Sequence, residues 1–144
     1  TAAYDLSLTD VDTIWYSSAA QAGAITLPQA TDSNKGMVIK VIAAANWSAT
    51  AFKLGFLNGG STTMVGTINV MTLDANSAAV GFAVTASSKA LVIDSDAVAT
   101  AGGAQGSTYT FTYLGEDLVH VDATAYITTG TVATTAAATV TAGI

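Results

Sequence analysis

Hydrophobic and polar positions alternate with a period of two in several parts of this chain, which is the pattern of strands buried on one face. The clearest case runs from Thr108 to Tyr113, where three aromatic residues alternate with three Thr residues. Between Ala51 and Phe56, large apolar residues again occupy every second position. Ala is abundant, but no window keeps a 3.6-residue period with charged residues opposite. The pattern therefore predicts strands and not helices.

Turn signals separate the predicted strands at intervals of roughly ten residues. They include Asn58-Gly59-Gly60-Ser61 and Gly115-Glu116-Asp117, which favour tight turns or a positive φ. Many short strands with no helical crossover predict an all-β chain, an antiparallel β-sandwich of jelly-roll type. The nine strands expected span residues 12–17, 24–27, 37–45, 51–57, 62–73, 78–86, 90–93, 108–115 and 118–128.

The two ends of the sequence differ from its middle. Residues 1–11 carry few strand signals, and residues 129–144 form an uncharged, low-complexity run of Thr, Ala, Val and Gly. We expect one domain over residues 1–144, with a sandwich at 12–128 and an extended arm at each end. Such arms pair with a sheet edge or lie against a neighbouring subunit, and thereby cover strands that would otherwise be open.

Composition and charge narrow the classes of function. Ala, Thr, Gly and Ser make up over half of the 144 residues, and only 10% of the residues are charged, against about 25% in an ordinary domain. The net charge of −6, with four Lys and no Arg, opposes binding to nucleic acid or to an anionic membrane. No apolar run approaches the ~20 residues of a membrane span. A surface of small, uncharged residues favours contact with other subunits.

Few residues offer reactive chemistry, because the chain has one His and no Cys. His120 shares a strand face with Asp122, a pair that could act as acid and base but is also typical of a strand surface. The adjacent acids Glu116 and Asp117 fit a solvated turn better than the two-acid cleft of a glycosidase. Oxygen ligands two residues apart at 94–96 and 74–76 lack the later ligands of a calcium loop. We predict no catalytic, cofactor or metal site.

Three aromatic residues support an alternative from a different class. Trp15, Tyr16 and Trp47 could stack on sugar rings, as in a secreted carbohydrate-binding or adhesin module. Trp15 fits the core or a subunit interface, whereas Trp47 follows a strand and is expected to be exposed at its end.

Two stretches resemble β-sandwich modules of tailed-bacteriophage virions. Residues 24–41, AITLPQATDSNKGMVIKV, resemble a recurrent segment in which a short strand ends in Leu-Pro and a polar loop and Gly precede an apolar strand. Residues 106–121, GSTYTFTYLGEDLVHV, resemble the closing hairpin of the same modules, although the Trp often found in their last strand is absent. In these families the modules form trimeric capsid decoration (cement) proteins, head fibres or tail-fibre segments.

The resemblance implies a structural virion protein without enzymatic activity or cofactor. A decoration protein binds across junctions between capsid subunits, so the expected partners are the major capsid protein and sister subunits of a homotrimer. The expected location is the capsid exterior, after synthesis in the host cytoplasm, and the alternative in the same class is a head-fibre or tail-fibre segment. The residues expected at interfaces, from their positions in the chain, are Tyr4, Leu6, Trp15, Trp47, Thr131, Val132, Val140 and Ile144.

Overall fold

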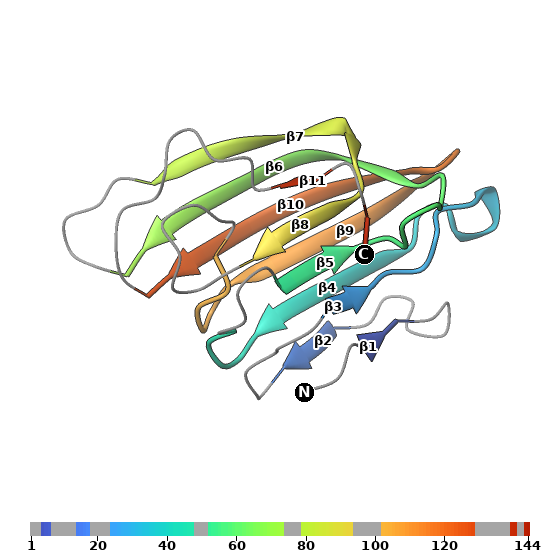
Figure 1. Cartoon of the computed structure of the whole chain (residues 1–144). Coiled ribbons are helices and arrows are strands. Elements are labelled where there is room, and N and C mark those ends of the chain that lie inside the picture. Colours follow the sequence, from blue (N-terminus) through green and yellow to red (C-terminus); the bar gives the residue numbers. More distant parts are fainter. Residues whose placement is uncertain are drawn as a thin grey trace.

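Two β-sheets pack face to face in the structure (Figure 1). The computed structural model describes residues 4–6, 14–17, 24–47, 52–73, 79–93, 102–128, 139–140 and 143–144. One sheet has five strands, in the order β1 (Tyr4–Asp5), β3 (Ala24–Thr26), β5 (Phe52–Gly55), β8 (Ala90–Ile93) and β11 (Thr139–Val140). The other has six, in the order β2 (Ile14–Ser17), β4 (Val38–Ala43), β9 (Thr108–Gly115), β10 (Leu118–Ile127), β6 (Thr63–Thr72) and β7 (Val80–Ser88). The predicted all-β sandwich is confirmed.

The pairing within the sheets is mixed, whereas the sequence predicted antiparallel neighbours throughout. Four pairs are parallel, namely β1 with β3, β3 with β5, β2 with β4, and β10 with β6. The other five pairs are antiparallel. Local alternation records only which face of a strand is buried, so it does not reveal which distant strand lies alongside. The long β10–β6 pair joins strands that are separated in the sequence by three others.

All nine predicted strands are present, and their bounds differ from the predicted ones by a few residues. The strands β9 and β8 have the bounds that were expected. Two additional strands of two residues, β1 and β11, lie within the predicted arms. The polar loop after β3 contains a short 3-10 helix at Asp32–Asn34, where the backbone N–H of Thr31 donates to Asn34 Oδ1 at 2.8 Å.

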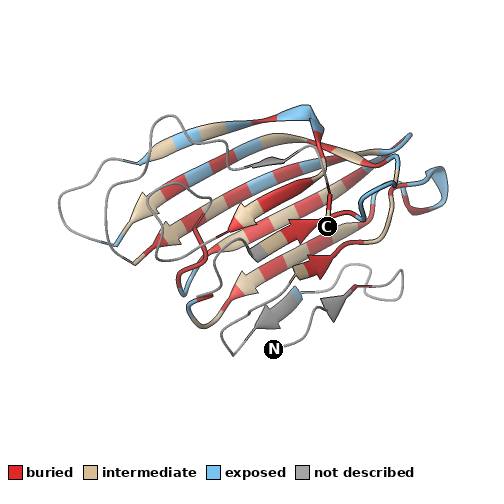
Figure 2. Ribbon diagram, in the orientation of Figure 1, coloured by how far each residue is buried: buried red, intermediate tan, exposed pale blue. Residues whose placement is uncertain are grey.

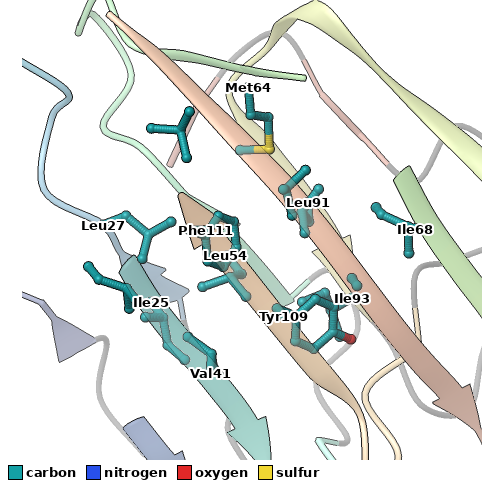
Figure 3. Close-up of a cluster of buried hydrophobic side chains, with 14 of the residues drawn as sticks. Ile25, Leu27, Val41, Leu54, Met64, Ile68, Leu91, Ile93, Tyr109 and Phe111 are labelled. Carbon is teal, nitrogen blue, oxygen red and sulfur yellow. The ribbon is translucent and has the colours of Figure 1, made fainter. Parts of the chain in front are cut away.

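The core lies between the two sheets. Tyr109, Phe111 and Tyr113 are buried on β9, as their alternation with Thr predicts. Figure 3 shows Phe111 and Tyr109 from this sheet in one cluster with Leu54 and Leu91 from the other. Burying one side chain of this size stabilises a fold by roughly 1.5–3 kcal/mol. The aromatic and branched side chains of both sheets therefore hold the layers together without a disulfide.

One glycine is required by a close backbone approach. Gly66 lies on β6, beside an irregularity in the β6–β7 register, and has a φ of 142°. A Cβ at this position would overlap the carbonyl oxygen of Val121 on β10. Only glycine combines this positive φ with such close contact between strands.

Candidate functional site: surfaces, edges and terminal strands

The outer face of the six-stranded sheet carries short polar side chains. Figure 2 shows buried and less buried residues alternating along β6, β10 and β9. One row of paired residues crosses the whole sheet, from β2 to β7, and consists of Ile14, Lys40, Thr110, Asp122, Thr67 and Ala83. The face is therefore broad and mostly uncharged, with Lys40 and Asp122 separated by Thr110.

His120 lies on this face together with Asp122, as the alternation predicts. Both side chains are exposed, while Val119 and Val121, the residues on either side of His120, point into the core. His120 pairs with Thr112 on one side and with Val65 on the other, so its neighbours across the strands are not acids. Within the described residues, no hydrogen bond or ion pair joins His120 to Asp122. Both side chains therefore lie on the exposed surface of β10.

Glu116 and Asp117 form the two-residue turn between β9 and β10, and both side chains are exposed. Ser61 Oγ donates a hydrogen bond to Asp117 Oδ1 at 2.6 Å. The backbone N–H of Glu116 donates to Asp32 Oδ1 at 3.3 Å. The carboxylates of Asp117 and Asp32 thus hold neighbouring loops together at this end of the sandwich.

No group of three or more His, Cys, Asp or Glu residues that could hold a metal ion occurs in the described part of the chain. The two sequence stretches considered as calcium loops, 74–76 and 94–96, lie outside the described residues.

Trp47 is fully buried, so the prediction that it is exposed at the end of a strand is wrong. Its ring stacks on that of Tyr109, with the ring centroids 5.9 Å apart and the planes 13° from parallel. The backbone N–H of Trp47 donates to the carbonyl oxygen of Gly103 at 2.8 Å. The loop before β9 therefore lies against this side chain, which removes Trp47 from any glycan platform and from a subunit interface. Trp15 and Tyr16 lie in β2, and their side chains are outside the described part.

The terminal strands pair with opposite edges of the five-stranded sheet. In β1, Tyr4 pairs with Ile25 of β3, and in β11, Val140 pairs with Ala90 of β8. This agrees with the expectation that the arms pair with a sheet edge. Leu6 was expected at an interface with another subunit, but it is only 5% exposed and belongs to the protomer's own core. The backbone N–H of Leu6 donates to Thr26 at the end of β3, which directs the side chain inward.

The last residues attach to the segment that follows β5. The backbone N–H of Ile144 donates to the carbonyl oxygen of Phe56 at 2.8 Å, and Asn58 donates to the carbonyl oxygen of Ile144 at 2.8 Å. Lys53 Nζ donates to the carbonyl oxygen of Gly143 at 3.1 Å. Ile144 is thus half-buried against its own chain, and Thr131 and Val132 lie outside the described residues.

Sequence reasoning did not single out the two outer strands of the six-stranded sheet as a site. Among the described strands, β2 and β7 each have a partner on one side only. Ile14 on β2 is a large apolar residue that is 61% exposed, and Gly81 and Ala83 on β7 are small and exposed. The sequence feature that could have indicated an open edge strand is the run from Val80 to Ser88, which contains no charged residue and no Pro.

No protein-family model, curated protein or solved structure matches this chain. Across the described ranges, no helix is long and apolar enough to cross a membrane.

Proposed function

We propose that this protein is a non-enzymatic structural component of a bacteriophage particle, a decoration protein that stabilises the capsid from outside. In this proposal it forms a homotrimer and binds the major capsid protein across subunit junctions. It is made in the host cytoplasm and functions in the virion.

The outer face of the six-stranded sheet is the observation that carries the proposal. Thr110, Thr67 and Ala83 on this face are uncharged, and the buried core of a protein–protein interface is depleted in charged residues. The pairing of both terminal strands with sheet edges supports the same reading, because it fixes the ends of the chain on a compact block. A protein that binds only the assembled shell stabilises it by mass action and needs no reactive group.

The proposal is tested by mixing purified protein with capsid shells assembled from the major capsid protein of the same phage. We expect saturable co-sedimentation with the shells, competition by unlabelled protein, and a higher temperature of shell disruption. A failure to co-sediment at saturating concentration would contradict a decoration role. Co-sedimentation with isolated tails, and not with shells, would support the fibre alternative.

The carbohydrate-binding alternative loses one of its three aromatic residues. Trp47 is enclosed by the protomer's core, so a Trp47→Ala substitution would affect folding before it affected any ligand. No observation on the described residues favours glycan binding over assembly.

A further inference from the structure

The six-stranded sheet ends in two strands that differ from the edges of the five-stranded sheet. The five-stranded sheet ends in β1 and β11, which are two residues long, and very short edge strands offer little backbone to a partner. Of the described edge strands, β7 is the longest, with nine residues, and β2 has four. Figure 1 shows β7 and β2 at opposite edges of their sheet. Among the described strands, the edges of the six-stranded sheet therefore offer the longer stretches of backbone to an added strand.

The absence of charged residues makes these two edges suitable for contact between copies of a chain whose net charge is −6. Neither β2 (IWYS) nor β7 (VGFAVTASS) contains a charged residue or a Pro. Natural proteins commonly block exposed edges with Lys, Pro or inward-pointing charges. Both strands lack these features, so two copies can join here without placing like charges opposite each other.

The two edge strands run in opposite directions, as the pairings across the sheet show. β2 is parallel to β4, β4 and β10 are both antiparallel to β9, and β10 is parallel to β6. β7 is antiparallel to β6, so it is also antiparallel to β2. When one copy continues the sheet of the next, β7 meets β2 of its neighbour in antiparallel orientation, which is the more stable pairing.

We propose that, in the homotrimer of the proposed function, β7 of each copy pairs antiparallel with β2 of the next copy. This inference rests on that trimer, because a closed ring of three requires two different surfaces in each contact. The proposed register continues the row of residues that crosses the sheet from one copy into the next.

This register brings together the two ends of the row that crosses the sheet. Ile14 begins the row on β2 and Ala83 ends it on β7, so Ala83 of one copy lies opposite Ile14 of the next. Both side chains belong to the outer face of the sheet. The exposed Ile14 then covers Ala83 and the neighbouring Gly81, which are small enough to accept it. A contact between short strands buries a small area, so we expect the trimer to dissociate on dilution.

A charge exchange between the two positions tests the contact. Ile14→Asp and Ala83→Lys each place a charge at an exposed site, so both variants should fold like the wild type in circular dichroism and urea unfolding. Each single variant should raise the concentration of half-dissociation by about tenfold or more. The double variant should recover most of this loss, because Asp at position 14 then faces Lys at position 83 of the next copy.

Thr67→Lys is the matched control, since Thr67 is exposed in the same row but lies on the inner strand β6. It should leave the trimer unchanged in light-scattering chromatography across a dilution series. Single variants that remain as trimeric as the wild type would overturn the inference. The wild type could instead be a dimer that Ala83→Lys disrupts and that the double variant does not restore. This result would overturn the inference and show that β7 of one copy pairs with β7 of the other. A monomeric wild type that still binds shells would overturn the inference and leave the decoration role in place.

Discussion

At the scale of single residues, the stack of Trp47 on Tyr109 anchors one end of the sandwich. Both residues are fully buried, and Tyr109 Oη donates to the carbonyl oxygen of Gly102 at 2.9 Å. The pair therefore holds the loop before β9 against the end of β4. The same loop also bonds directly to β4, because the backbone N–H of Gly106 donates to the carbonyl oxygen of Ala43, the last residue of that strand.

Trp47→Ala should lower the free energy of unfolding by about 3–5 kcal/mol, since it leaves a cavity beside Tyr109. Trp47→Phe keeps an aromatic ring in the site and serves as the control, with a smaller loss. Urea unfolding followed by far-ultraviolet circular dichroism measures both variants. A loss below about 1 kcal/mol for Trp47→Ala would contradict the buried stack.

Two buried tyrosines make the fold sensitive to alkali. Burial raises the pKa of Tyr109 and of Tyr113 above the ordinary value of a phenol. The unfolded chain therefore loses these protons first, and stability is complete below a pH of about 10. Above it, stability should fall by up to about 1.4 kcal/mol per pH unit for each tyrosine.

Urea unfolding at a series of pH values from neutral to alkaline measures this dependence. Tyr109→Phe should make it shallower, because one phenol no longer titrates. Equal slopes for Tyr109→Phe and the wild type would show that Tyr109 does not couple ionisation to folding.

The sequence correctly predicted which way side chains point where the alternation of polar and apolar residues decides it. Tyr109, Phe111 and Tyr113 point inward, and His120 shares the outer face with Asp122. The predictions that Trp47 is exposed and that Leu6 lies at a subunit interface were wrong, because distant segments of the chain surround both residues. A loop some 55 residues along the chain lies against Trp47, and a bond to Thr26 fixes Leu6. Neither contact leaves a local pattern in the sequence.

At the scale of elements, the hairpin of β9 and β10 has a turn in which one residue, Glu116, suits the backbone poorly. Glu116 and Asp117 have φ values of 49° and 61°, which is the left-handed region that a two-residue hairpin turn requires. Non-glycine residues occupy this region at a cost, and Asn bears it better than Glu.

Glu116→Asn should therefore stabilise the protein by roughly 0.5 kcal/mol, measured as a higher urea midpoint. Asp117 is left in place in this test, because its carboxylate accepts the hydrogen bond from Ser61. Glu116→Val is the opposing variant and should destabilise, since a β-branched residue fits a positive φ poorly. A midpoint that falls with Asn would contradict the assigned turn.

The C-terminal strand stabilises the five-stranded sheet from its own protomer. Removing the residues after Gly130 deletes β11 and the hydrogen bonds of Ile144 with Phe56 and Asn58. The truncated chain should still fold but unfold at a lower urea concentration, with a loss of about 1–3 kcal/mol from these bonds. Lys53→Met, which removes only the bond to Gly143, should lose less. An unchanged midpoint after truncation would show that the terminal residues contribute nothing to the protomer.

Strand positions could be predicted from the sequence, but strand neighbours could not. Alternation and turn residues located all nine strands between residues 12 and 128. The parallel β10–β6 pair depends on how the whole chain is arranged, because three strands intervene in the sequence. The same limit hid the candidate interface, since β2 and β7 become edges only when the order of the sheet is known.

At the scale of the whole molecule, the β-sandwich has the proposed role of binding to other proteins and to copies of itself. The low charge favours burial against other proteins, because charged residues are depleted at the core of interfaces. The six-stranded sheet adds two uncharged edges of opposite direction, which suit a closed ring of identical copies. The proposed homotrimer is tested most directly by the number of chains that associate in solution.

Light-scattering chromatography of the wild-type protein over a wide concentration range tests that number. The proposed trimer should appear as a particle of three times 14.4 kDa that dissociates on dilution. A mass of 14.4 kDa at every concentration would contradict the assembly of this chain into a trimer.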